Sequence, residues 1–299
     1  MKPTLLILAA GMASRYGSMK QIDGFGPNGE TIIDYSIYDA IKAGFGKVVF
    51  IIKEEFLDNF KAIFEPKLAG KIETGYVFQN FDLKQFGIDI DIPREKPWGT
   101  AHAILAGRNE IKEPFCVINA DDYYGFDAFQ KMVTFLTEEA NGSNYSMIGY
   151  EIGKTLSDYG SVSRGVCKVD DAGYLEDINE RTKVLRDGDA IVYEEDDKQH
   201  PLAPDTRVSM NFWGFTPEVF KVTEDLFREF AMANQEKPKS EFFIPLVAEH
   251  LVKTNKASFK VVPTDSKWFG VTYKEDKPIV QDSIDQLVKN GTYPENLWN

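Results

Sequence analysis

Apolar runs of strand length alternate with segments of helical periodicity along the first part of the chain. Residues 4–8 form such an apolar run, and isoleucines then recur at helical spacing over residues 33–41. Thr31 and Asp34 stand where a capping box would begin this helix, and Gly44 stands where a helix commonly ends. The pattern predicts a strand, a loop and a helix in that order.

The same alternation continues to about residue 119. An unbroken apolar run at 48–52 is typical of a strand buried on both faces, and helical spacing follows over residues 56–64. Further strands are predicted at 76–79 and 115–119, with an acidic loop and a helix from Thr100 between them. Repeated strand and helix units predict an α/β fold with a mixed, mostly parallel sheet flanked by helices.

The second half has a less regular pattern. Short strands are predicted around 145–152, 161–169 and 208–215, and helices at 217–233 and 241–253, as an extension of the same sheet.

Residues 182–207 contain a run of four acidic residues, two prolines and little periodicity, and we predict a mobile acidic surface loop there. No stretch rich in Pro, Gly and Ser marks a boundary, so we predict one domain over residues 1–299.

Charge and composition narrow the classes of function. The chain has 34 basic and 47 acidic residues, a net charge of −13, which argues against nucleic acid as a partner. Two distant cysteines and three histidines disfavour a disulfide framework or a zinc cluster, so any metal is expected to be a hard cation held by carboxylates and phosphate. No apolar segment is long enough for a signal peptide or a membrane span, and we expect a cytoplasmic protein without a membrane partner.

The loop after the first predicted strand carries the sharpest motif. Small residues Ala9, Ala10 and Gly11 allow backbone amides to approach a ligand closely, and Arg15 and Lys20 add two cations. This combination suits a polyphosphate at the carboxyl end of a strand, where open α/β sheets bind ligands. An ordinary strand-to-helix turn with solvated basic side chains is the alternative.

This loop resembles the L-A-A-G-x-G-T-R motif, followed by a lysine, of the nucleotidyltransferases that make nucleoside-diphosphate sugars. Ala13 replaces the second glycine and Ser14 the threonine, while Arg15 and Lys20 match. The resemblance to these sugar-1-phosphate pyrophosphorylases implies a Rossmann-like fold. It also implies a nucleotide-binding half at 1–140 and a smaller sugar-phosphate-binding half at 141–299.

A second motif, at residues 97–103, is predicted to bind the base. Gly99 precedes a helix start and offers free amides, and Thr100 offers an N-cap-like hydroxyl. The segment resembles the base-reading motif of the family. Gln79 resembles a family glutamine that pairs with a pyrimidine, which favours UTP or dTTP, although a strand-end glutamine bonded to backbone fits equally well. We assign no role to His102.

The third motif follows the strand at 115–119. Asp121 matches the family's metal aspartate, and Mg²⁺ needs only one or two carboxylates when substrate phosphates complete its shell. A helix-capping aspartate is the alternative, and it suits Asp122 better than Asp121.

A late segment resembles the family's W-x-D motif, whose aspartate is the second metal ligand, but Gly270 stands in its place. Asp265 and Asp276 are nearby substitutes. Asp276 is also predicted to be the N-cap of the last helix.

The resemblance implies four sugar-contacting residues. Gly160 would approach the sugar through its backbone, and Glu180 and Asn211 would bond its hydroxyls. Arg181 takes the place of a family lysine near the sugar phosphate. For each of them an ordinary turn, surface ion pair or strand-end amide is the alternative.

The reaction implied is attack of a sugar 1-phosphate on the α-phosphorus of a nucleoside triphosphate, giving a nucleoside-diphosphate sugar and pyrophosphate. Arg15, Lys20 and Mg²⁺ on Asp121 would position and neutralise the phosphates. A glycosyltransferase of the same fold, a phosphocholine-type cytidylyltransferase and a catalytically silent sensor remain alternatives. An oligomer is possible.

Overall fold

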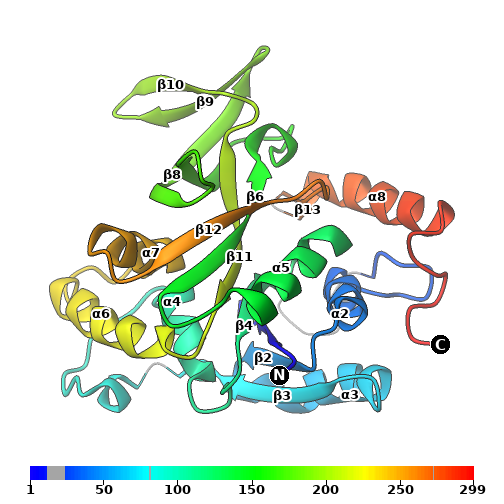
Figure 1. Ribbon diagram of the computed structural model, residues 1–299, viewed down its shortest axis with the longest axis horizontal. Helices are drawn as coiled ribbons and strands as arrows, with labels where there is room; N and C mark the ends of the chain where they lie inside the picture. The colour runs from blue at the N-terminus through cyan, green and yellow to red at the C-terminus, as the bar shows by residue number, and fades with distance from the viewer. Residues whose placement is uncertain (12–23, 81, 272) are drawn as a thin grey trace.

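The computed structural model describes residues 1–11, 24–80, 82–271 and 273–299, and these form a mixed sheet with helices on both faces (Figure 1). The N-terminal strands are β1 (Thr4–Leu8), β2 (Lys47–Ile52), β3 (Glu73–Phe78), β4 (Phe115–Asn119) and β5 (Asp122–Tyr123). The later strands are β6 (Asn144–Glu151), β7 (Val162–Val169), β8 (Leu175–Asp187), β9 (Ala190–Glu195), β10 (Lys198–Leu202), β11 (Arg207–Phe215), β12 (Ser258–Pro263) and β13 (Phe269–Gly270). The helices are α2 (Ile32–Ala43), α3 (Leu57–Leu68), α4 (Thr100–Ile104), α5 (Phe126–Glu138), α6 (Val219–Ala233), α7 (Ile244–Lys253) and α8 (Lys277–Lys289).

Eleven of the described strands share one sheet, in the order β10-β9-β8-β7-β11-β4-β1-β2-β3, with β6 paired to β11 and β12. Strands β3, β2, β1 and β4 pair in parallel, as expected for strand and helix units. Beyond β4 the pairing along β11, β7, β8, β9 and β10 is antiparallel, whereas β12 pairs with β6 in parallel. The predicted mixed α/β fold is confirmed, with the parallel strands concentrated in the first half.

The core lies on both faces of the central strands because their side chains alternate. In β1, Leu5 and Ile7 belong to the core under α2, α3 and α5, whereas Leu6 belongs to the core under α4, α6 and α7 (Figure 1). The unbroken apolar runs in β1, β2 and β4 follow from this double burial.

Helix α2 shows how local sequence fixes an element. Thr31 and Asp34 form the predicted capping box, and Gly44 ends the helix with a φ of 112°, a left-handed conformation that favours glycine. The predicted start and stop are both confirmed.

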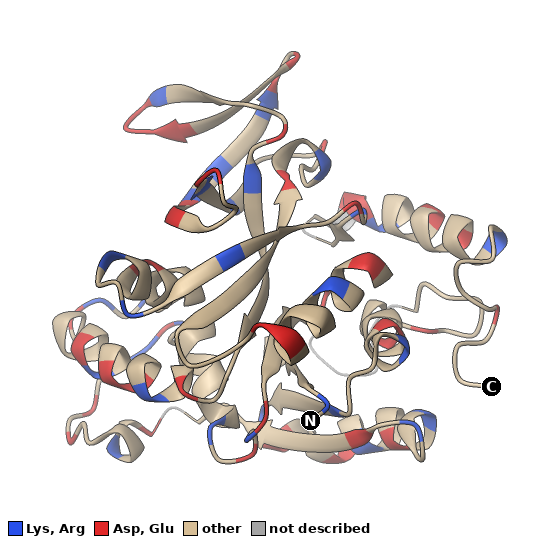
Figure 2. Cartoon of the chain, in the orientation of Figure 1, with Lys and Arg blue, Asp and Glu red and all other residues tan. Residues whose placement is uncertain are grey.

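The prediction of a mobile loop at 182–207 is wrong. These residues form the end of β8 and the hairpin of β9 and β10, which projects from the body of the molecule (Figure 1). Asp196 and Asp197 have φ values of 51° and 58°, as the two central residues of a type I′ hairpin turn require. Glu194 and Glu195 therefore end β9, and Asp196 and Asp197 form the turn of an arm that carries both acidic and basic residues (Figure 2).

Helix α8 and the C-terminal segment pack behind β5. The Tyr123 ring stacks on Phe269 at 4.2 Å, and its hydroxyl lies 2.8 Å from the Tyr293 hydroxyl. Tyr293 donates a hydrogen bond of 2.7 Å to Asp39 in α2, whose burial raises its pKa to about 7. These contacts fix β5 at the end of β4.

Within the described part of the chain, no helix combines the length and the apolar character needed to cross a bilayer.

Candidate active site

A cavity of about 810 Å³ opens at the carboxyl ends of β1 and β4. The chain moves from β1 outward to β2 and β3 and then returns to place β4 on the other side of β1, so the strand order reverses at this point. Ligands of open α/β sheets bind at such switch points. The wall combines residues from both halves of the chain, among them Leu8, Ala10, Gly11, Gln79, Gly99, Thr100, Asn119, Asp121, Asp122, Ser163, Arg164, Glu180, Asn211 and Trp268.

The first residues after β1 reach this cavity. Ala10 and Gly11 line it, and a Cβ added to Gly11 would meet no atom of the described residues within 4 Å. Ala9 instead lies in the core with 2% of its surface exposed. Arg15 and Lys20 lie outside the described residues, and their roles stay predictions.

The predicted base-reading residues Gln79, Gly99 and Thr100 all line this cavity. Gly99 is the N-cap of α4 with a φ of 101°, and a Cβ there would lie 2.6 Å from the Phe242 carbonyl oxygen, so glycine is required. The prediction that Thr100 caps the helix is wrong: it is the first helical residue, and its hydroxyl accepts a hydrogen bond of 3.2 Å from the Ile244 amide. Thr100 thus joins α4 to the start of α7.

Gln79 contacts His102, a residue with no predicted role. The Gln79 Nε2 atom lies 3.4 Å from His102 Nδ1. Burial lowers the pKa of His102 to about 3, with help from the charges of Arg108 and Arg94, so the ring is neutral. Because an amide nitrogen can only donate, the neutral ring accepts this bond and orients the Gln79 amide.

A chain of amide hydrogen bonds positions the acidic end of the site. Trp213 Nε1 donates to Asn211 Oδ1 at 3.1 Å, Asn211 Nδ2 donates to Asn119 Oδ1 at 2.7 Å, and Asn119 Nδ2 donates to Asp122 Oδ2 at 2.8 Å. Asn211 has a φ of 63°, beside the register shift between β11 and β6. The predicted sugar contact Asn211 thus also supports the Asp122 carboxylate.

The alternative that Asp122 caps the next helix is wrong, because Gly125 is the N-cap of α5. Asp122 pairs with Gly270 across β5 and β13. A Cβ at position 270 would lie 2.4 Å from Asp122 Oδ1. The space in front of Gly270 is therefore taken by the Asp122 carboxylate, next to Asp121 on the cavity wall.

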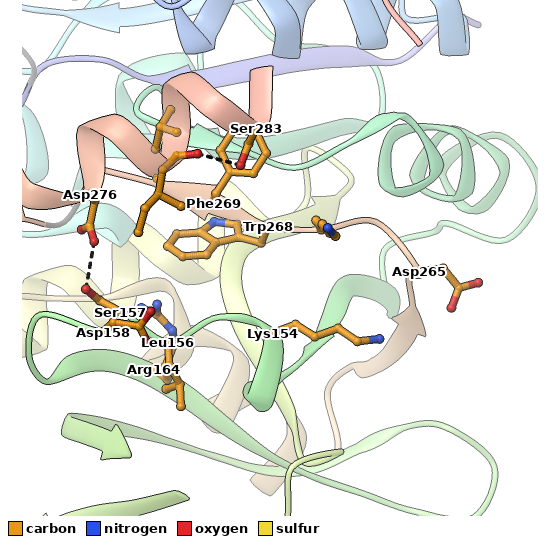
Figure 3. Close-up of a pocket in the computed structure, with 14 residues that line it drawn as sticks. Lys154, Leu156, Ser157, Asp158, Arg164, Asp265, Trp268, Phe269, Asp276 and Ser283 are labelled. Carbon is orange, nitrogen blue, oxygen red and sulfur yellow. Dashed lines mark hydrogen bonds between the residues drawn. The ribbon is translucent and has the colours of Figure 1, made fainter. Parts of the chain in front are cut away.

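The two other candidate carboxylates, Asp265 and Asp276, line a separate cavity of about 460 Å³ (Figure 3). Asp276 accepts hydrogen bonds from the Ser157 hydroxyl at 2.9 Å and the Tyr273 amide at 2.7 Å. It stands at the N-cap of α8, as predicted. Neither residue lines the larger cavity.

The structure separates the predicted sugar contacts. Glu180 lines the larger cavity, where burial raises the pKa of its carboxyl against the opposing charge of Arg164. Arg181, the next residue of β8, forms an ion pair with Glu195, and its guanidinium lies 4.3 Å from the Tyr193 ring. Adjacent strand residues point to opposite faces of the sheet, so the side chains of Glu180 and Arg181 do not share a face.

Gly160 also lies away from the larger cavity. A Cβ added there would come within 2.7 Å of the Tyr273 hydroxyl, which donates a hydrogen bond of 2.6 Å to the Ser161 carbonyl. Its small size allows this close packing between the turn and Tyr273.

Arg164 is the site residue that sequence reasoning missed. Only 6% of its surface is exposed, and it lines both cavities. Its position two residues from the apolar Val162 and Val166 places a charge in the apolar register of β7, a signal that could have found it.

Comparisons with known proteins agree with this architecture. The family model described as nucleotidyl transferase matches residues 6–271. The fold is similar to the inositol-1-phosphate CTP transferase of T. maritima, with 14% identity, a TM-score of 0.64, and coverage of 96% of this chain and 97% of that one.

Two further solved structures share the fold. A UDP-glucose pyrophosphorylase complexed with UDP-glucose has 17% identity and a TM-score of 0.57, covering 96% of this chain and 99% of that one. A protein assigned as a glucose-1-phosphate thymidylyltransferase of Bacillus anthracis, in complex with a sucrose, has 12% identity and a TM-score of 0.62, covering 94% of both chains. No curated protein sequence matches the chain. From the family match over most of its length, the chain belongs to the nucleotidyl transferase family.

Proposed function

We propose that this protein joins a nucleoside triphosphate and a sugar 1-phosphate to give a nucleoside-diphosphate sugar and pyrophosphate. The observation that carries the proposal is the single cavity that holds the base-side residue Gln79, the carboxylates of Asp121 and Asp122, and the sugar-side residue Glu180. In this proposal residues 1–140 bind the nucleotide and residues 141–299 bind the sugar phosphate. Relatives of the same fold named for UDP-glucose, inositol-1-phosphate and glucose-1-phosphate support it.

The reaction requires the two substrates to be held in line and the negative charge of their phosphates to be neutralised. A phosphate monoester has a second pKa of about 6, so the attacking sugar 1-phosphate is largely ionised at neutral pH and needs no general base. His102, which is buried and neutral, is not required to take a proton. In this proposal Arg15 contacts the leaving β- and γ-phosphates and Lys20 the α-phosphate.

Asp121 and Asp122 are the residues that would hold Mg²⁺. No cluster of three or more His, Cys, Asp or Glu residues suited to a metal occurs in the described ranges. A donor set of two carboxylates nevertheless fits Mg²⁺, which binds through one or two carboxylates and the substrate phosphates. When bound, the ion would neutralise charge on the reacting phosphates. In this proposal Asp122 supplies the second carboxylate that the family motif has at the position of Gly270.

Gly270→Ala is expected to lower turnover at least about tenfold, because the new methyl group displaces the Asp122 carboxylate from the cavity wall. The melting temperature should fall by a few degrees, since the methyl group would also lie 3.2 Å from the Trp268 ring and 3.3 Å from the Asp121 carbonyl oxygen. Turnover at saturating Mg²⁺ and thermal unfolding are measured on the same preparation, with exposed neighbour Lys267→Ala as the control. Unchanged turnover would remove Asp122 from the site.

Gln79 is proposed to read a uracil or thymine base. With Nε2 held toward His102, the Gln79 carbonyl oxygen is available to accept a hydrogen bond, which matches the N3–H of these bases and not the N3 acceptor of cytosine. The neutral His102 ring therefore sets the orientation of the Gln79 amide, and this orientation selects the base.

Gln79→Ala is expected to reduce the preference for UTP over CTP about tenfold, the value of one hydrogen bond, with a smaller effect on turnover. The ratio of kcat/KM for the two triphosphates checks it, and Gln85→Ala, an exposed glutamine, serves as the control. The same ratio in Gln79→Ala and wild type would make Gln79 structural.

A cytidylyltransferase acting on a phosphoalcohol is the second candidate, favoured by the shared fold with the inositol-1-phosphate CTP transferase. A thermal-shift screen separates the two, because specific binding to the native state raises the melting temperature. The proposal predicts the largest shifts with UTP or dTTP and Mg²⁺, increased by a sugar 1-phosphate. The largest shift with CTP would favour the second candidate.

A further inference from the structure

A chain of buried polar groups connects the segment after α8 to β5 and α2. The Tyr123 hydroxyl lies 2.8 Å from the Tyr293 hydroxyl, which donates a hydrogen bond of 2.7 Å to Asp39 Oδ2. Each of these three residues is no more than 4% exposed. Because the Tyr293 hydrogen is used on Asp39, the Tyr293 oxygen accepts the hydrogen of Tyr123. Tyr293 is therefore the middle link between α2 and β5.

Asp39 is a costly residue to bury for packing alone. Its Oδ1 atom is buried and has no hydrogen-bond partner among the described residues. Burial of a polar group costs free energy unless its hydrogen bonds are made, and each unsatisfied atom in a native structure needs an explanation. Such local costs are expected at functional sites. The one oxygen of Asp39 that is hydrogen-bonded holds Tyr293, and a carboxyl group can accept this bond in either protonation state.

The chain ends one residue from the acidic part of the larger cavity. Asp122 lines this cavity, and its neighbour Tyr123 points to the opposite face of β5, where its ring stacks on Phe269 at 4.2 Å. Helix α2 also holds the β5 backbone directly, because Ser36 Oγ donates to the Asp122 carbonyl oxygen at 3.4 Å. Ser36 lies three residues before Asp39, on the same side of α2. A shift of Tyr123 would therefore move the Asp122 carboxylate with it.

We propose that Tyr293 is a positioning residue, which holds the Asp122 carboxylate at the cavity wall by joining Tyr123 to Asp39. The side chain of Asn119 supports Asp122 from β4, and the tyrosine chain supports the β5 backbone from α2. Groups that orient a metal-binding carboxylate change metal affinity about tenfold or more when they are removed. This inference rests on the proposed function for the assignment of Asp122 to the metal.

The test is Tyr293→Phe, which removes the hydroxyl and keeps the ring that packs edge-on against Tyr35 at 4.9 Å. Titration calorimetry gives the Kd of UTP for the full-length protein without metal and with saturating Mn²⁺, an ion that takes the same oxygen ligands as Mg²⁺. The ratio of these two values measures the contribution of the metal site. In Tyr293→Phe the ratio should fall about tenfold while the metal-free Kd is unchanged. Tyr38→Phe is the matched control, because its ring also packs edge-on against Tyr293, at 5.8 Å, and it should keep the wild-type ratio.

Two substitutions of Asp39 separate positioning from folding. Asp39→Asn keeps an acceptor for the Tyr293 hydroxyl, whereas Asp39→Leu removes it at similar size. Asp39→Asn should keep the wild-type ratio, and Asp39→Leu should lose it as Tyr293→Phe does. Thermal unfolding of the ligand-free variants is measured alongside.

The proposal is overturned if Tyr293→Phe and Asp39→Leu keep the wild-type ratio, or if wild type shows no Mn²⁺-dependent binding of UTP. It is also overturned if the ratio follows the melting temperature of the variants instead of the presence of the hydroxyl and its acceptor. These are binding data. Wild type that binds UTP with Mn²⁺ but releases no pyrophosphate would contradict the proposed function and leave the role of Tyr293 standing.

Discussion

Asp121→Asn is expected to lower pyrophosphate formation about a thousandfold while leaving the melting temperature nearly unchanged. The substitution removes one negative charge at almost constant shape from the wall of the larger cavity. If Asp121 and the substrate phosphates hold Mg²⁺, this carboxylate keeps the cation where negative charge develops on the phosphates, and losing such stabilisation costs about two to three orders of magnitude. The measurement is the steady-state rate of pyrophosphate release at saturating triphosphate, with thermal unfolding of the same sample.

Asp122→Asn and Asp265→Asn complete this comparison. Asp122→Asn should also be severe, because its carboxylate fills the space before Gly270. Asp265→Asn should be near wild type, since Asp265 is exposed and lines only the smaller cavity. Full activity of Asp121→Asn, or of wild type in EDTA, would contradict the metal assignment.

Asp34→Ala is expected to reduce the free energy of unfolding by about 3 kcal/mol. The Asp34 side chain is fully buried and accepts hydrogen bonds from Lys67 Nζ at 2.8 and 3.0 Å, the Thr31 amide at 2.8 Å and Trp298 Nε1 at 3.2 Å. Alanine removes the capping box and leaves the partly buried Lys67 ammonium group without its carboxylate partner. It also removes the hydrogen-bond acceptor of the Trp298 indole. Urea unfolding checks this, read as a lower midpoint at constant slope.

The control for Asp34→Ala is Asp58→Ala, an exposed acidic residue in the first turn of α3. Its effect should stay within about 0.5 kcal/mol, as is usual for surface substitutions. Similar stability of the two variants would contradict the buried network. Fluorescence should report a more exposed Trp298 in Asp34→Ala only.

The sequence predicted the first half of the fold well because burial on both faces leaves a plain signal. Apolar runs locate β1, β2 and β4 to within one residue, since the apolar side chains of these strands belong to one of the two cores on either face of the sheet. The arm of β8, β9 and β10 was missed because its outer residues are exposed, so apolar alternation is weak there. The acidic run favours a mobile loop when the sequence is considered alone, although Asp side chains tolerate the left-handed conformation of a tight hairpin turn.

The candidate site was predictable where a residue directly follows a central strand. Gly11, Gln79 and Asp121 each follow the carboxyl end of a parallel strand, and strand order alone brings such ends together. The sugar side depends on which face of a strand a residue occupies. One residue of difference sends Arg181 away from the cavity that Glu180 lines, and Arg164 is paired with Arg181 across β7 and β8.

The proposed reaction is decided by pyrophosphate release from UTP or dTTP with Mg²⁺ and a panel of sugar 1-phosphates, with the nucleotide product identified by mass. We expect pyrophosphate and a nucleoside-diphosphate sugar in equal amounts, with UTP or dTTP preferred over CTP, and no product without the sugar phosphate. Absence of pyrophosphate with every pair of substrates, or release of free nucleotide from a nucleoside-diphosphate sugar instead, would contradict it.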